Sequence, residues 1–287
     1  MLFSSILISF NGLTIRNITI ADAMLVTLYR SIALVLSISF FLLIRDHTVF
    51  LRKFYRIGNP GIAAAFLMGS ANVCFLQAIT NTTVANTLFT ISIIPFLTAF
   101  FAFLFLKEKL SKISFLTMLV ASSGSFIMFK NGVEQGQLFG NLMAILTALL
   151  FSFFALIMRK FRHVDMIPTL VLGGLVSVCI ALVASFDSLG ISAHDLIICV
   201  FMGAVLSGVA NCGFIIATRY LLAAEVTLYM FIEFALGPFW VWLFLNEHMN
   251  VSTLIGGLII MIALATKSVA ELIRKENRTK KQPILPS

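Results

Sequence analysis

The charged residues that lie within apolar stretches are the first candidates for chemistry. Glu233 and Arg30 each lie inside a long apolar segment. A charged side chain at the centre of a bilayer costs about 2.5–3.5 kcal/mol on insertion scales, so it normally faces a cavity or a partner. Glu233 could carry a proton or contact a cationic, amine-bearing ligand, and Arg30 could hold a carboxylate through two parallel hydrogen bonds. An internal ion pair between the two is the alternative, and Arg30 could also extend toward the membrane interface.

Three amides and a tyrosine are further candidates for contact with a ligand. Asn72 and Asn211 are flanked by small residues, which allow helices to approach closely and let amides bond across them. Packing between helices and contact with a ligand are both open for these two residues. Gln77 is a similar amide nearer a helix end, and Tyr229 lies one turn before Glu233 on the same helical face.

Two prolines lie deep within apolar segments. Pro95 and Pro238 each lack a backbone donor and free a carbonyl group in the membrane interior. Such a position is either a helix break that lines a cavity or a simple kink. The pair Gly237–Pro238 favours a local break most.

The cysteines, the histidines and the glycine pattern indicate no disulfide, metal or nucleotide chemistry. The four cysteines lie within apolar segments without paired spacing, which is typical of small buried hydrophobic residues. The four histidines lie in or beside separate loops, with no HxxxH spacing, so we expect no metal site. The pattern GxxxxGK[ST] does not occur, so direct use of ATP is not expected. We therefore expect no cofactor and no catalytic residue.

The composition identifies the elements that must position these residues. Of the 287 residues, 60% are apolar and 11% are charged, with mean hydropathy +1.05, whereas an average soluble domain is about 45–50% apolar and about 25% charged. This contrast excludes a soluble enzyme and a disordered chain and leaves an integral membrane protein. Because the segments are apolar on all sides, we expect helices and not a β-barrel. The predicted fold class is all-α, with about ten transmembrane helices over residues 1–15, 22–44, 60–79, 84–106, 113–129, 139–158, 165–185, 195–217, 223–245 and 251–268.

The positive charges predict the orientation of these helices. If the N-terminus is cytoplasmic, 17 of the 20 lysines and arginines fall in loops on the inner side and two, Arg16 and Lys130, on the outer side. Such a bias is the usual signal of membrane topology. The net charge of +8 therefore indicates contact with anionic lipid and not with nucleic acid. The first segment, at 15 residues, is expected to be a short or truncated span, and its sequence is not typical of a signal peptide.

The chain also repeats itself. Residues 69–78 (GSANVCFLQA) align with residues 208–217 (GVANCGFIIA), and Leu104–Glu108 align with Leu243–Glu247 at the same shift of 139. A one-residue gap between these matches pairs Thr87-Leu88-Phe89 with Thr227-Leu228-Tyr229. Two copies of a five-helix unit must enter the membrane from opposite sides, because five is odd. We therefore expect an inverted repeat with a ligand site near the midplane, over residues 1–130 and 139–268, followed by a basic cytoplasmic tail over 269–287.

These motifs resemble the drug/metabolite transporter superfamily, in its ten-helix branch with two EamA-type repeats. The resemblance rests on residues 85–111, with Pro95 in mid-helix, on the weaker second copy at residues 225–250, on the Gly-Ser-Ala-Asn motif and on the Tyr29–Arg30 pair. Pro238 aligns four residues beyond Pro95, so the two copies differ there. Members of this superfamily move amino acids, nucleobases, S-adenosylmethionine, drugs and other metabolites in either direction.

The resemblance implies a secondary transporter of small organic metabolites. We expect amino acids or related compounds, moved by alternating access with export favoured, and proton coupling through Glu233 as a hypothesis. The alternatives are an uptake or exchange carrier for a metabolite such as S-adenosylmethionine and, from other classes, an integral-membrane enzyme or a structural membrane subunit. An enzyme would need carboxylates or histidines clustered at one membrane face, and Asp46, Asp165 and Glu108 are scattered among the loops.

The expected partners are a small-molecule substrate and membrane lipid, without nucleic acid, for a monomer or a homodimer. The expected location is the bacterial inner membrane, with several passes and both termini cytoplasmic.

Overall fold

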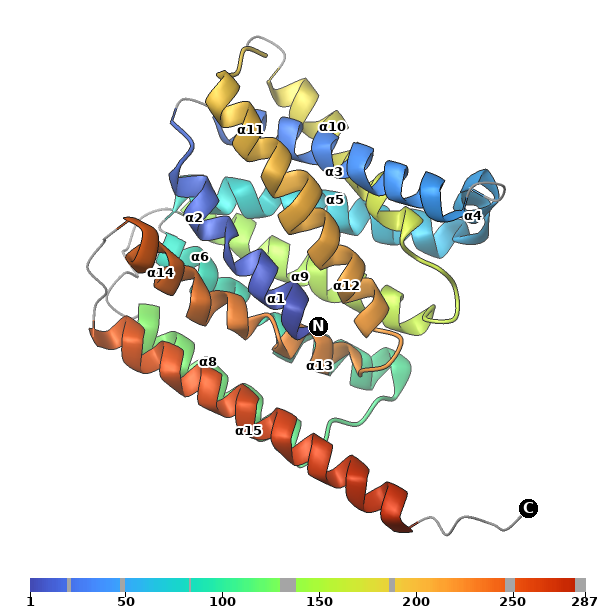
Figure 1. The fold of residues 1–287 in the computed structure, drawn as a ribbon, viewed down its shortest axis with the longest axis vertical. Coiled ribbons are helices and arrows are strands. Elements are labelled where there is room, and N and C mark those ends of the chain that lie inside the picture. Colours follow the sequence, from blue (N-terminus) through green and yellow to red (C-terminus); the bar gives the residue numbers. More distant parts are fainter. Residues whose placement is uncertain are drawn as a thin grey trace.

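The computed structural model describes residues 1–19, 22–46, 50–82, 84–129, 138–185, 189–245 and 251–281. Within these ranges all regular structure is helical (Figure 1). Seven helical segments are long and apolar enough to cross a membrane, and three shorter ones, Leu2–Arg16, Lys112–Met128 and Pro168–Ala184, are also apolar. The predicted all-α membrane fold is thus confirmed, and seven of the ten predicted spans meet the length and hydropathy of a membrane-crossing helix among the described residues.

The first five spans follow one another with short connections. They are α1 (Leu2–Ser9) continued by α2 (Asn11–Arg16), α3 (Ala23–Asp46), α5 (Gly58–Asn81), α6 (Val84–Ile91) continued by α7 (Ile94–Phe101) and the π-helical η1 (Ala102–Leu106), and α8 (Lys112–Phe129). The short helix α4 (Phe50–Arg56), which the sequence analysis did not predict, lies between α3 and α5. It exposes Leu51 and Tyr55.

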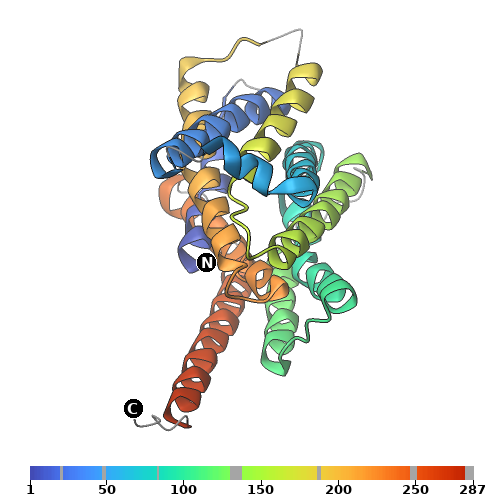
Figure 2. The same ribbon diagram turned by 90° about the vertical axis from the view of Figure 1, so that its right-hand side faces the viewer.

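The second five spans have the same order. They are α9 (Leu138–Lys160), α10 (Pro168–Ala184), α11 (Ala193–Phe201) continued by the π-helical η2 (Met202–Val209) and α12 (Ala210–Ala217), α13 (Ala223–Leu228) continued by α14 (Phe231–Leu245), and α15 (Val251–Lys281). The ends of the ten helical segments agree with the predicted spans within a few residues, except for the C-terminal end of the tenth. The helix α15 continues past residue 268 to Lys281, and its end extends beyond the rest of the bundle (Figure 2).

The packing of the spans shows the inverted repeat. The second span of one half contacts the second span of the other (α3 with α10), and the two fifth spans, α8 and α15, lie side by side (Figure 1). Other contacts between the halves occur in matching pairs: α5–α9 with α12–α1, α7–α9 with α14–α1, and α5–α10 with η2–α3. Exchange of the halves therefore reproduces these contacts, as expected for two copies related by a twofold axis in the membrane plane.

Small residues allow the closest helix crossings. A Cβ atom at Gly124 of α8 would lie 2.8 Å from the carbonyl oxygen of Gly256 in α15, so neither position leaves room for a side chain. The outward faces of the bundle carry large apolar side chains, among them Leu36, Phe40 and Phe66, each about 60% exposed or more. Hydrocarbon is the environment that such a surface requires.

Candidate functional site

A cavity of about 80 Å³ lies between the two halves of the molecule. Seven spans contribute to its wall, three of them from the second repeat. Its apolar wall includes Met68, Phe75 and Phe151, and its polar lining is made by Asn11, Arg30, Asn72, Thr147, Ser207, Asn211 and Glu233. A small apolar body with several converging polar groups is the usual character of a small-molecule site.

Arg30 reaches this cavity from the first half of α3. It is 6% exposed, and its Nη2 donates a hydrogen bond of 3.3 Å to Oδ1 of Asn72 in α5. Gly203 in η2 packs directly on the backbone carbonyl of Arg30, where a Cβ atom would overlap the oxygen. The close approach of α3 and η2 thus fixes the height of Arg30 in the bundle.

Glu233 lies in the first turn of α14 and lines the same cavity. It also lines a second cavity of about 40 Å³, whose wall includes Ser4 and Ser5 of α1. Both Arg30 and Glu233 belong to the described part of the chain, and no ion pair within 4.0 Å joins them. A guanidinium and a carboxyl group therefore face one cavity without a direct ion pair.

The repeat-related amides Asn72 and Asn211 face the same cavity from α5 and α12. Asn72 holds the guanidinium of Arg30, and Asn211 lines both cavities. The sequence repeat thus places one amide from each half at the interface between the halves.

Gln77 and Tyr229 do not line either cavity. The amide oxygen of Gln77 accepts a hydrogen bond of 3.0 Å from Asn81, one turn further along α5. Tyr229 faces α15, where its hydroxyl lies 3.4 Å from Oγ of Ser268. The positions of Gln77 and Tyr229 therefore do not favour the predicted contact with a substrate in either cavity.

Two helix interruptions open onto the cavity. The first separates α6 from α7 at Ser92 and Ile93, and Pro95 follows it at the start of α7. The second separates α13 from α14 at Tyr229 and Met230. Helix α14 continues through residue 238, so the second interruption lies earlier in the chain than the sequence analysis placed it.

The backbone at both interruptions bonds to residues three positions back. Ile93 N donates to Thr90 O (3.3 Å), and Met230 N donates to Thr227 O (3.0 Å). These tighter turns give hydrogen-bond partners to backbone N–H groups, which in a regular α-helix would bond to the carbonyl four positions back. Ile91 and Ile94 flank the first interruption, Met230 belongs to the second, and all three line the cavity.

Sequence reasoning missed several residues of the site. Asn11, Thr147 and Ser207 are short polar side chains of a kind common in transmembrane helices, so nothing in their type singled them out. Outside the cavity, Lys267 is one of the 17 cations that the charge pattern assigns to the inner side, but it is 1% exposed and buried within the bundle. Among the described residues, no three His, Cys, Asp or Glu side chains gather so that they could hold a metal ion.

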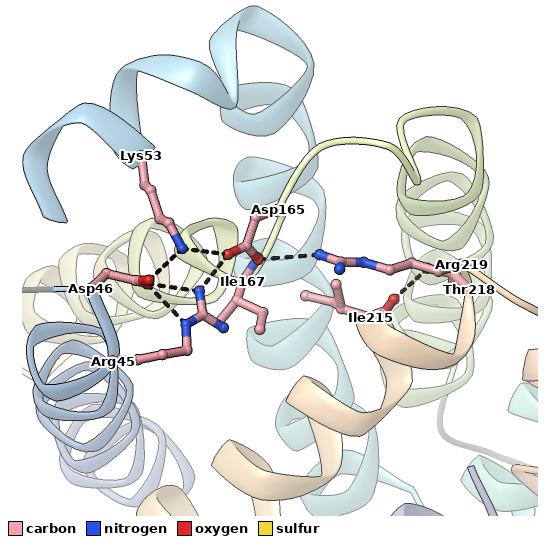
Figure 3. A network of polar contacts seen from close by, with 8 residues as sticks. All are labelled: Arg45, Asp46, Lys53, Asp165, Ile167, Ile215, Thr218 and Arg219. Carbon is pink, nitrogen blue, oxygen red and sulfur yellow. Dashed lines mark hydrogen bonds and ion pairs between the residues drawn. The ribbon is translucent and has the colours of Figure 1, made fainter. Parts of the chain in front are cut away.

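A charged network joins the two halves away from the cavity (Figure 3). Asp165, in the loop between α9 and α10, contacts Arg45 at the end of α3, Lys53 of α4 (2.9 Å) and Arg219 after α12 (3.3 Å). Lys53 also binds Asp46 (2.7 Å). Asp46 and Asp165 are therefore not scattered, as the sequence suggested, but share cations from both repeats.

The charge of Asp165 depends on these cations. Burial alone would raise the pKa of Asp165, but the hydrogen bond from Lys53 and the positive charge of Arg45 outweigh burial and lower this pKa below its ordinary value.

A second inter-repeat ion pair, Arg159 Nε to Glu108 Oε1 at 2.6 Å, lies between α9 and the segment after η1.

The fold and the cavity define an integral membrane protein of two inverted helical repeats around a central polar site. Comparison with known families gives a match to the EamA-like transporter family over residues 1–130 and 138–268. The chain therefore belongs to this family, within the drug/metabolite transporter superfamily. Membership implies transport of small metabolites.

The comparisons with individual proteins support the fold. One solved structure, titled "Crystal structure of protein", has a TM-score of 0.78 at 15% sequence identity and covers 96% of each chain. At this identity the likeness shows the fold alone. The search of curated proteins gave no match.

Proposed function

We propose that the protein is a secondary active transporter of amino acids or related compounds, that it works by alternating access, and that protons couple through Glu233. The observation that carries the proposal is the cavity between the repeats, which presents a guanidinium and a carboxyl group without a direct ion pair. A substrate with a carboxylate and an ammonium group would provide each with an opposite charge. The apolar wall would receive the rest of the substrate.

Alternating access requires the wall of the cavity to move. Residues at both helix interruptions, Ile91, Ile94 and Met230, belong to this wall. The two interrupted spans, whose breaks line the cavity, are the elements that we infer to move.

The orientation and direction of transport are part of the proposal. The end that carries Arg45, Lys53 and Arg219 is rich in cations, so we place it in the cytoplasm, together with both termini and the basic tail. Export is the working direction. Counterflow in vesicles of known orientation distinguishes it from uptake or exchange, including a carrier of S-adenosylmethionine.

The first experiment identifies a substrate and then tests coupling. Thermal unfolding of purified protein in the presence of amino acids, purines and polyamines reveals ligands, because a ligand that binds the folded state raises the unfolding temperature. The radiolabelled ligand is then measured in proteoliposomes with and without a pH gradient. Coupling of one proton to one substrate predicts accumulation of about tenfold per pH unit, since a pH unit corresponds to about 1.4 kcal/mol.

Replacement of the carboxyl group tests the role of Glu233. Glu233→Gln should abolish accumulation driven by the gradient, while exchange without a gradient continues but needs a higher substrate concentration, because the partner of the ammonium group is lost. Asp22→Asn, which removes an exposed acid outside the cavity, is the matched control and should accumulate normally. Gradient-driven accumulation by Glu233→Gln at the normal level would overturn coupling through this residue, and the lack of any ligand-induced stabilisation would contradict the substrate site.

A further inference from the structure

A buried lysine lies outside the central cavity, where the proposed function does not use it. Lys267 belongs to α15, at the side of the bundle where α15 packs along α8. Its side chain is fully buried. A buried ammonium group is costly unless other groups compensate its charge, so its surroundings are informative.

Two of the groups around Lys267 belong to the short helix α13 and its C-terminal end. Its Nζ lies 4.0 Å from Oε1 of Glu225, in the first turn of α13, and 5.3 Å from the ring centroid of Tyr229, the residue that ends this helix. The Tyr229 hydroxyl contacts Ser268 at 3.4 Å, and Oε1 of Glu225 accepts a hydrogen bond of 2.9 Å from Ser114 of α8. An ion pair and a cation–π contact thus hold α13 against α8 and α15.

The first repeat has an apolar contact at the corresponding place. Phe89, which the repeat aligns with Tyr229, packs on Phe126 of α8 with ring centroids 5.9 Å apart. Among the described residues at the two interruptions, a buried lysine with an ion pair and a cation–π contact occurs only in the half that carries Glu233. Packing alone would not require it, because the first interruption is held without charge.

The clamped helix leads directly to the cavity. Tyr229 is followed by Met230, which lines both cavities, and the backbone N–H of Glu233 donates to the carbonyl of Met230 at 2.9 Å. The position of Glu233 therefore depends on the interruption that Lys267 contacts through Tyr229.

We propose that Lys267, with Glu225 and Tyr229, forms a buried clamp that fixes the second helix interruption and thereby positions Glu233 in the substrate site. These three are positioning residues. The proposal rests on the role of Glu233 in the proposed function, but the clamp itself is measurable without a substrate or a pH gradient.

Hydrogen exchange of backbone amides, followed by mass spectrometry of the full-length protein in nanodiscs, tests the clamp. In Lys267→Met the amides of residues 229–233 should exchange at least tenfold faster than in the unaltered protein. Lys267→Arg keeps the cation and should stay within threefold. The amides of residues 91–94, at the first interruption, are the internal control and should not change. Unchanged exchange at 229–233 in Lys267→Met, or equal acceleration at both interruptions, overturns the proposal.

A double variant separates the clamp from the effect of a charge left without its partner. Glu225→Gln combined with Lys267→Met removes both charges and is the more tolerable change if Lys267→Met folds poorly. The clamp predicts that residues 229–233 still exchange at least tenfold faster in the double variant. A return to the original rate would assign the effect to the uncompensated carboxylate and overturn the clamp.

The link to Glu233 is measured in the transport assay. Lys267→Met should lower gradient-driven accumulation at least threefold, and Lys267→Arg should restore it. Normal accumulation together with accelerated exchange would overturn the positioning of Glu233. If instead Glu233→Gln has no effect on accumulation, the proposed function fails, whereas the exchange result still decides whether the clamp exists.

Discussion

Arg30 and Glu233 set the character of the site because a guanidinium and a carboxyl group share one cavity without a direct ion pair. Arg30 has the amide of Asn72 as its hydrogen-bond partner. A desolvated ion pair is expensive to form and expensive to break. A site that leaves the partner position vacant can use each charge to recognise a ligand instead.

Asp165 provides a pH-dependent property that follows from a single residue. Its pKa is lower in the folded protein than in the unfolded chain, so its contribution to stability is complete above the unfolded value of about 3.9. This contribution is lost as the pH falls through the folded value. We expect the unfolding temperature to fall as the pH is lowered below about 4, by roughly 2–4 °C from this residue, since a partly exposed network contributes about 1 kcal/mol or less.

Thermal unfolding in detergent between pH 3 and pH 7 measures this contribution. Asp165→Asn should be less stable than the unaltered protein at pH 7, and the difference should narrow at pH 3. A difference that stays constant over this range would contradict the assigned ionic role of Asp165.

The residue scale is also where prediction from sequence was most uneven. A charge or an amide in an apolar stretch is a strong signal, and the structure brings Arg30, Asn72, Asn211 and Glu233 to one cavity; their roles in transport stay predictions. Lys267 gave no such signal. A lysine near the end of a helix reads as a loop cation unless the rotation of that helix is known, and its burial depends on how α15 packs.

At the scale of elements, the sequence predicted the ten spans because their length and apolar composition follow from the thickness of the bilayer. The helix interruptions were harder. Pro95 directly follows the first interruption. The second interruption lies at Tyr229 and Met230, and α14 continues through residue 238 without a break. A proline at the start of a helix has no unmet donor, but an interruption without proline depends on turn bonds and tertiary contacts that composition does not reveal.

The crossing of α3 and η2 gives a prediction at this scale. Gly203→Ala places a methyl group on the Arg30 carbonyl and 2.8 Å from Cβ of Ala33, so the two helices must separate. We expect a loss of about 1–3 kcal/mol, typical of overpacking, measured as a lower unfolding temperature together with weaker ligand-induced stabilisation.

The matched control for this prediction is Gly12→Ala in α2. A Cβ atom at Gly12 has no neighbour within 4 Å, and alanine favours a helix over glycine by about 1 kcal/mol. Gly12→Ala should therefore be neutral or stabilising. Equal stability of the two variants would contradict the close contact at Gly203.

For the whole molecule, the repeat in sequence corresponds to a repeat in contacts. The pairs α3–α10 and α8–α15 each join equivalent spans of the two halves, and α5–α9, α7–α9 and α5–α10 have counterparts in α12–α1, α14–α1 and η2–α3. The sequence carried this architecture because aligned motifs survive in both copies, such as Gly69–Ala78 and Gly208–Ala217. The sequence carried no information about the charged network of Asp165, since its members come from four separate segments that only folding brings together.

Accessibility of the cavity from both sides of the membrane tests the central claim of alternating access most directly. In a background with the four native cysteines replaced, Ser207→Cys places a thiol on the cavity wall, and Leu36→Cys, on the lipid-facing surface, is the control. We predict that a membrane-impermeant thiol reagent labels position 207 when added to either side of oriented vesicles, and that it leaves position 36 unlabelled. Labelling of position 207 from one side only, with and without substrate, would contradict the account.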